Sequence, residues 1–174
     1  MQIALKTLAV LVELTCFINT AVQTDIQRIL EIETNSRLSL TETQSMAACI
    51  CQNAREYEIS PYLILGVVLT ESGADKNATN KTRAGRSCLG LMQISSYWWD
   101  KELKKQGIIS TRKDYHSING GISAGAYVLS KYIGKANGDI EKALLKYSGS
   151  KSKSSRAFKA YFSNVTKYNA TWRR

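Results

Sequence analysis

Residues 60–73 read SPYLILGVVLTESG, and this stretch decides the fold. Serine followed by proline favours a helix start, because Pro61 at the first helical position lacks an N–H that would otherwise stay unbonded. The residues from Tyr62 to Leu69 are apolar on every side of such a helix, which indicates burial. Gly73 supplies the usual C-terminal stop. The sequence therefore predicts a buried central helix.

Glu71 lies in the last turn of this helix and shares a face with Leu63 and Val67. Loss of hydration at such a position raises the pKa of a carboxyl group, and the negative end of the helix dipole also opposes ionisation. Both effects favour a protonated carboxyl near neutral pH, which is what a general acid requires. The alternative is a glutamate that extends from the helix end into solvent.

Further helical patterns lie on both sides of the buried helix. Residues 25–40 predict a weak amphipathic helix, and a second helix is expected from Thr41 to about Tyr57. Residues 74–88, which are polar and rich in Gly and Asn, favour a long loop or a small irregular hairpin. Later helices are expected over 95–106, 117–133, 140–147 and 155–165. We therefore expect a mainly α fold: a single helical domain over 25–174, with a loop or small hairpin after the buried helix.

The composition is that of a globular protein with an anionic partner. At 174 residues the chain has room for one ordinary domain, and its 44% hydrophobic and 22% charged residues exclude a disordered protein. The formal net charge of +10 indicates nucleic acid, a membrane surface or an acidic polymer such as a bacterial wall. No P-loop, dinucleotide-binding or helix-turn-helix signature is present.

Residues 1–24 resemble a secretory leader. Lys6 provides a basic flank, and the mostly apolar run from Leu8 to Ile18 has the length of a signal-peptide core. This run is shorter than the about 20 apolar residues that cross a membrane. Because Glu13 interrupts it, an amphipathic helix that stays on the protein is the alternative. We expect export to the periplasm or the medium, with membrane association left open.

The chain has four cysteines, Cys16, Cys49, Cys51 and Cys88. If Cys16 leaves with the leader, the other three allow at most one disulfide. A bridge from Cys49 or Cys51 to Cys88 would suit an oxidising compartment. No paired Cys-x-x-Cys occurs and His116 is the only histidine, so we expect neither a metal nor another cofactor.

Three short blocks follow one another along the chain: Glu71-Ser72, then GLMQI at 90–94, then ALLKYSG at 143–149. Together they resemble the signature of the SLT-type lytic transglycosylases, a branch of the lysozyme-like superfamily related to goose-type lysozyme. The resemblance covers roughly residues 47–168. It implies an α+β lysozyme-like fold, and cleavage of the β-1,4 bond between N-acetylmuramic acid and N-acetylglucosamine in peptidoglycan.

The resemblance also implies roles for the residues of the first two blocks. Glu71 corresponds to the acid that protonates the glycosidic oxygen and then acts as a base. Ser72 lies where the family has a polar residue that contacts the glycan. Gly90 would let the backbone approach the sugar, Met92 would lie against it, and Gln93 would bind the N-acetyl groups.

In the third block Tyr147 matches a tyrosine whose hydroxyl orients the catalytic glutamate. Ser148 follows it where the family usually has asparagine, and its hydroxyl could replace that substrate contact. Trp98 and Trp99 come soon after the second block. Because neighbouring residues on a helix point about 100° apart, we expect one ring in the core and the other in the sugar groove.

A single catalytic carboxylate favours a lyase over a hydrolase. Most glycosidases use two carboxyl groups, whereas the segment from Lys76 to Gln93 contains no Asp or Glu. In the family that the chain resembles, O6 of the muramic acid attacks C1 of the same sugar and leaves a 1,6-anhydro end. This reaction is fast because the attacking group is tethered to the group that it attacks. A hydrolytic goose-type-like lysozyme is one alternative. A non-catalytic basic module that binds glycan or nucleic acid is the other.

The partners expected on this basis are the glycan strands of peptidoglycan. The resemblance is to compact enzymes that open the wall for secretion, conjugation (pilus) or phage assemblies, whose components are further candidate partners. Basic residues are frequent after Lys146, and they fit a solvated face or retention on an anionic wall better than nucleic acid, which we do not expect. We expect a monomer.

Overall fold

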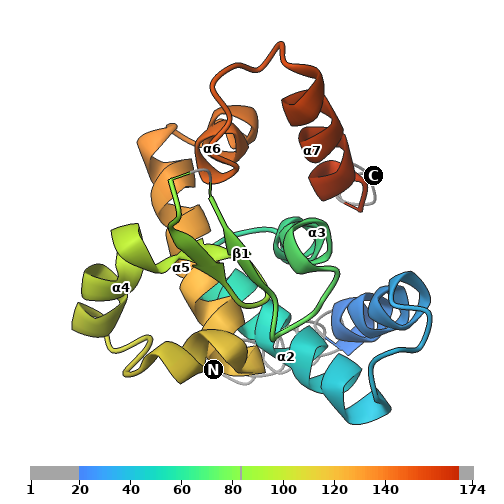
Figure 1. Ribbon diagram of the computed structural model, residues 1–174. Helices are drawn as coiled ribbons and strands as arrows, with labels where there is room; N and C mark the ends of the chain where they lie inside the picture. Colours follow the sequence, from blue (N-terminus) through green and yellow to red (C-terminus); the bar gives the residue numbers. More distant parts are fainter. Residues whose placement is uncertain (1–19, 83, 169–174) are drawn as a thin grey trace, which may run out of the picture.

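The computed structural model describes residues 20–82 and 84–168, and the fold is mainly helical with a small sheet, as expected (Figure 1). Most of the proposed leader, including Cys16, lies outside the described residues. The first described helix spans residues 20–33 rather than 25–40. Asn35 and Ser36 follow with positive φ values of 50° and 53°, a conformation that cannot continue a right-handed helix.

Helix α2, Leu40–Glu56, begins slightly earlier than expected because Ser39 is its N-cap. The side chain of Ser39 accepts a hydrogen bond from the backbone N–H of Glu42, and the Glu42 carboxylate accepts one from the backbone N–H of Ser39. This reciprocal arrangement is a capping box. The buried face of α2 packs against α3 and α5.

Helix α3, Pro61–Ser72, is the buried helix that the sequence predicts. Every residue from Tyr62 to Val68 is buried, and Gly73 ends the helix in the left-handed conformation with φ 60°. Gly66 allows a close approach of the C-terminal helix, because a Cβ atom at this position would overlap the backbone carbonyl oxygen of Val165. Figure 1 shows α7 lying directly above α3.

The polar segment after α3 folds as a hairpin rather than an open loop. Strands β1, Thr79–Lys81, and β2, Ser87–Leu89, pair antiparallel with Asn80 opposite Cys88. A third strand, β3, Ile94–Ser95, extends the sheet in the order β1-β2-β3 and was not predicted. The GLMQ block therefore lies in the tight connection between β2 and β3.

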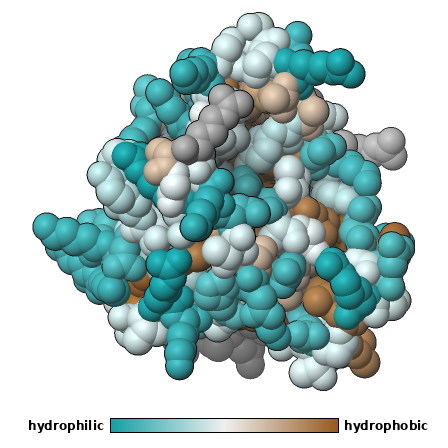
Figure 2. All heavy atoms as spheres, in the orientation of Figure 1, coloured by the Kyte–Doolittle hydropathy of each residue, from teal (hydrophilic) through white to brown (hydrophobic). Residues whose placement is uncertain are grey.

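The remaining helices agree with the predicted ranges to within two residues. They are α4, Ser96–Lys105; α5, Ile118–Lys135; α6, Ile140–Tyr147; and α7, Arg156–Thr166. The short 3-10 helix η1, Arg112–His116, was not predicted. Hydrophilic side chains cover most of the face in Figure 2. Within residues 20–82 and 84–168, none of the helices combines the length and apolar character needed to cross a bilayer.

Candidate active site

Glu71 ends the apolar helix α3, and its carboxylate turns back into the protein. One of its oxygens, Oε1, accepts a hydrogen bond of 2.7 Å from the hydroxyl of Tyr161. Burial raises the pKa of Glu71 to about 7, although the Tyr161 hydrogen bond acts in the opposite direction by stabilising the carboxylate. The residue can therefore exist both as an acid and as its conjugate base near neutral pH, which suits proton transfer.

Tyr161 is the functional residue that sequence reasoning missed. It lies on α7 between Phe158 and Phe162, and such aromatic residues at helical spacing are typical of core packing. Phe158 is indeed buried, but the Tyr161 hydroxyl reaches a carboxylate that lies 90 positions earlier in the chain. The only sequence signal was a hydroxyl within an aromatic stripe, which does not identify a partner so far away.

Tyr147 has a different hydrogen-bond partner from the one that the resemblance implied. Its hydroxyl donates to the backbone carbonyl oxygen of Met92 at 2.8 Å, not to Glu71. The two residues are still neighbours, because the charge of Glu71 adds to burial in raising the pKa of Tyr147. Tyr147 thus holds the GLMQ connection in place, and Tyr161 orients the acid.

Gly90 and Met92 both have packing roles within the protein, and contact of either residue with a sugar stays a prediction. Gly90 has φ 70°, and a Cβ atom here would overlap the carbonyl oxygen of Tyr115, so its missing side chain admits protein backbone. Met92 is fully buried against Gly125, where any side chain larger than hydrogen would overlap it. An adaptable thioether fills this gap in the core.

Ser72 and Gln93 bond within the protein. The Ser72 hydroxyl is placed to donate to the carbonyl oxygens of Val68, at 3.1 Å, and Leu91, at 2.8 Å, which joins the end of α3 to the GLMQ connection. The side-chain amide of Gln93 donates to the Gly90 carbonyl oxygen at 2.9 Å. Gln93 still faces the groove described next, so contact of either residue with glycan stays a prediction.

A groove of about 590 Å³ opens between the sheet with α4 and the helices α5 and α6. Glu71 lies behind its wall, since the charge of Glu71 raises the pKa values of both Cys88 and Tyr147, which line it. The groove brings together the second and third sequence blocks from opposite sides. Its lining residues are Thr82, Ala84, Arg86, Cys88, Gln93, Ile94, Ser95, Trp98, Trp99, Val128, Tyr132, Lys146, Tyr147, Ser148, Gly149 and Lys151.

Both tryptophans line this groove, whereas we expected only one of them to do so. Trp98 is 64% exposed, and the guanidinium group of Arg86 lies 4.7 Å from the centre of its ring. Trp99 is partly buried and packs edge-on against Tyr132, with the ring centres 5.7 Å apart. The exposed ring of Trp98 and the partly buried ring of Trp99 provide apolar faces of the kind on which sugar rings pack.

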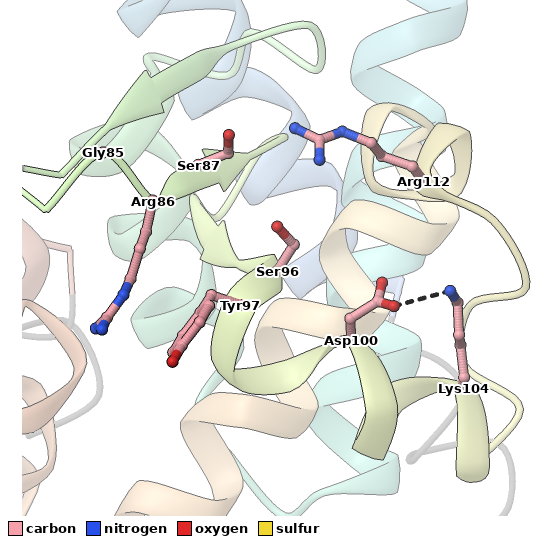
Figure 3. Close-up of a pocket in the computed structure, with 8 residues that line it drawn as sticks. All are labelled: Gly85, Arg86, Ser87, Ser96, Tyr97, Asp100, Lys104 and Arg112. Atoms are coloured by element: carbon pink, nitrogen blue, oxygen red, sulfur yellow. Dashed lines mark ion pairs between the residues drawn. The ribbon is translucent and has the colours of Figure 1, made fainter.

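A second cavity, of about 450 Å³, is lined by residues of the hairpin, of α4 and of η1 (Figure 3). Arg112 extends from η1 toward Ser87, and Asp100 pairs with Lys104 at 2.8 Å. Arg86 lines both this cavity and the groove. The lining of the groove includes the cationic side chains of Arg86, Lys146 and Lys151, with no Asp or Glu among its described residues.

The three cysteines in the described part of the chain are free, so neither predicted disulfide forms. Cys49, on α2, faces α5, with its sulfur 3.6 Å from Oδ1 of Asn119. Cys88 lies instead on β2 at the groove, next to Glu71 and Tyr147. Among residues 20–82 and 84–168, no group of three or more His, Cys, Asp or Glu residues is arranged to hold a metal ion.

The comparisons with known proteins agree with this geometry. The family model described as the Transglycosylase SLT domain matches residues 48–169, which include all three sequence blocks and Tyr161. No curated protein matches the chain. The matched range, the mainly helical fold and the acid at the end of α3 fit together. The chain therefore belongs to the SLT transglycosylase domain family of the lysozyme-like superfamily, whose activity is the cleavage of glycosidic bonds in peptidoglycan.

Proposed function

We propose that the protein is a lytic transglycosylase that cleaves the β-1,4 bond between N-acetylmuramic acid and N-acetylglucosamine and leaves 1,6-anhydro ends. The observation that carries this proposal is a single carboxyl group, Glu71, with a pKa raised to about 7 behind a groove whose described lining contains no second carboxylate. Hydrolysis by two carboxyl groups needs a nucleophile or a base opposite the acid. Transfer within the substrate needs only one residue that gives and takes a proton.

The first step is proton donation from Glu71 to the glycosidic oxygen as its bond to C1 of the muramic acid breaks. The N-acetylglucosamine leaves with a hydroxyl at O4, and the substrate's own N-acetyl group assists this departure. The hydrogen bond from Tyr161 stabilises the carboxylate that remains. The side chain thus has a donor in place for the charge that develops on it.

The second step returns the proton to Glu71. Its carboxylate accepts the proton of the O6 hydroxyl while O6 forms a bond to C1 and displaces the N-acetyl oxygen that had bonded to C1, which closes the 1,6-anhydro ring and restores a neutral N-acetyl group. No water is consumed, and the enzyme ends in its starting protonation state. Because O6 is tethered to the reacting sugar, its effective concentration is far higher than that of a free nucleophile.

Digestion of purified peptidoglycan, followed by mass spectrometry of the products, tests this proposal. Anhydro ends are expected, whereas reducing ends would establish the hydrolytic alternative and no release would indicate a binding module. Glu71→Gln should lower the rate by roughly 1000-fold, since it removes general acid–base catalysis. Glu42→Gln is the matched control and should keep full activity; a fully active Glu71→Gln variant would show that another group is the acid.

We also propose that the enzyme is exported and opens the wall locally for a secretion, conjugation or phage apparatus. The leader-like pattern of residues 1–24 supports export, and the substrate class lies outside the cytoplasmic membrane. N-terminal sequencing of the mature protein from fractionated cells tests this. A mature chain that begins near residue 25 supports export, while an intact N-terminus in the cytoplasm contradicts it.

A further inference from the structure

A third cavity, of about 400 Å³, adjoins the groove at the side of α5 and α6. Tyr132 and Lys146 line both spaces, so the cavity and the groove are direct neighbours. We name this cavity the lysine pocket after the cations that dominate it. Its lining residues are Tyr132, Lys135, Ala136, Lys142, Leu145 and Lys146.

The lysine pocket is cationic without compensating acids in its lining. Lys135 and Lys146 form no ion pair with any residue in the described part of the chain. Lys142 has one, with Asp139 at 3.1 Å, but its side chain is still 63% exposed. The cavity of Figure 3 differs, because Asp100 within it pairs with Lys104. Positive charge is therefore left available at the lysine pocket.

Binding of the glycan backbone does not explain the positive charge of these lysines. N-acetylglucosamine and the ring of N-acetylmuramic acid are neutral, and the groove already offers them aromatic rings and neutral polar groups. The negative charges of the substrate are the carboxylates of the peptide that hangs from each muramic acid. The apolar part of the lining, Ala136, Leu145 and the ring of Tyr132, fits the methyl groups of the alanines in that peptide.

We propose that the lysine pocket binds the acidic stem peptide of the muramic acid held in the groove. The enzyme then prefers strands with free stem carboxylates to strands whose carboxylates are amidated. This inference rests on the proposed function, because it assumes that a peptidoglycan strand occupies the groove. The pocket stands on rigid elements, since Lys142 and Lys146 belong to α6, whose N-cap Asp139 accepts from the backbone N–H of Lys142 at 2.9 Å.

The test compares two forms of one substrate. Uncross-linked glycan strands with intact stem peptides are divided, and the carboxylates of one half are converted to neutral amides with ammonia and a carbodiimide. The wild-type enzyme should cleave the free-carboxylate strands roughly tenfold faster at low concentration, the sum of a few exposed ion pairs. This preference should shrink in high salt, which screens such pairs.

The decisive variant combines Lys135→Gln, Lys142→Gln and Lys146→Gln. It should cleave the free-carboxylate and the amidated strands at equal rates, because the preference for free carboxylates is lost. A matched control combines Lys105→Gln, Lys113→Gln and Lys159→Gln, exposed lysines that line neither the groove nor the lysine pocket. The control has the same net charge and should keep the preference; if it loses the preference too, overall charge rather than the pocket is responsible and the proposal is wrong.

Binding to the inactive Glu71→Gln protein separates this inference from the proposed function. Fluorescence titration with each strand form measures the preference without any cleavage. Tighter binding of the free-carboxylate strands, lost in the triple variant, supports the lysine pocket even if the wild-type protein releases no product. Equal binding of the two forms overturns it, whether or not the enzyme cleaves them.

Discussion

Two glutamates, on the helices α2 and α3 that pack together, have pKa values shifted in opposite directions. Glu42 lies in the first turn of α2, where its carboxylate accepts hydrogen bonds from Lys76, at 2.7 Å, and from Ser39. These bonds lower its pKa to about 2. Glu71 lies in the last turn of α3, where burial raises its pKa to about 7. Among the described residues its one hydrogen-bond donor is the neutral hydroxyl of Tyr161. One residue type thus serves as a helix cap in one place and as an acid in the other.

The difference in pKa follows from the end of the helix at which each carboxylate lies. The first turn of a helix has free N–H groups and a positive partial charge, both of which stabilise an anion. The last turn has free carbonyl oxygens and the opposite charge. At Glu71 the apolar residues of α3 also remove water, and no described cation pairs with it. Position in the helix and the number of donors therefore separate a carboxylate that caps a helix from one whose pKa suits a general acid.

The largest expected effect is on how the free energy of unfolding depends on pH. Between its ordinary value of 4.5 and its pKa of about 7 in the folded protein, Glu71 keeps a proton that the unfolded chain loses. Its contribution to stability is therefore fully present below pH 4.5 and lost as the pH rises through about 7. At pH 8 the buried carboxylate should destabilise the fold by on the order of 3 kcal/mol.

Glu71→Gln removes this dependence. Urea denaturation should give a variant close to wild type at pH 4.5 and more stable than wild type at pH 8. For Glu42 the sign is reversed, because its pKa is lowered: its contribution is present above pH 4.5 and is lost as the pH falls toward 2. If the Glu71→Gln and wild-type proteins keep a constant difference in stability across this range, Glu71 does not have a raised pKa.

The next effect concerns the contact that brings Tyr161 to the acid. Gly66→Ala would place a methyl group against the Val165 carbonyl oxygen and force α7 away from α3. We expect a loss of about 2 kcal/mol in the free energy of unfolding, together with reduced activity. Gly134→Ala on α5 is the control, because a Cβ atom there meets nothing within 4 Å. It should leave activity unchanged and, if anything, raise stability; equal effects of the two substitutions would contradict the close contact.

A smaller effect is expected when only the hydroxyl of Tyr161 is removed. Tyr161→Phe takes away the hydrogen bond that lowers the pKa of Glu71, so this pKa should rise further. The rate should fall on the order of tenfold, about 1.4 kcal/mol, because the carboxylate formed during the reaction is less stable. The decline in activity above neutral pH should also move to higher pH.

Tyr62→Phe provides the matched comparison. The Tyr62 hydroxyl donates to Asp25 at 2.9 Å, a similar bond far from the groove, so its loss should leave the pH profile in place. The profiles come from rates of peptidoglycan solubilisation between pH 5 and 9. An unchanged profile in the Tyr161→Phe enzyme would mean that the hydroxyl does not act on Glu71.

Much of the fold was predictable because its signals are local. Ser60-Pro61, the apolar run and Gly73 define α3 within one short stretch, and the later helices follow from apolar spacing between glycine-containing loops. Strand β3 and the 3-10 helix η1 were not predictable, since each is too short to show a periodic pattern in the sequence. Both elements also depend on contacts with neighbouring segments.

The site was predictable where its chemistry is local and not where it depends on packing between distant segments. Glu71 follows from the helix that precedes it, whereas Tyr161 depends on the approach of α7 to α3 at Gly66. Gly90 and Met92 belong to a recognisable block, but the block does not tell which members face a sugar and which face Tyr115 or Gly125. The cysteine spacing, likewise, did not indicate that Cys49 faces α5 while Cys88 lies at the groove.

The smallest expected effect tests the role of Glu42 in the capping box of α2. Ser39→Ala removes the hydroxyl that accepts from the Glu42 backbone N–H at 3.3 Å and donates to the Glu42 carboxylate at 3.0 Å. Loss of this N-cap should lower the free energy of unfolding by about 1 kcal/mol, whereas Thr41→Ala, at an exposed neighbouring position, should change it little. Neither variant should move the pH profile of cleavage. A shifted profile would mean that the two helix ends are electrostatically coupled, and the capping carboxylate would then belong to the environment of the acid.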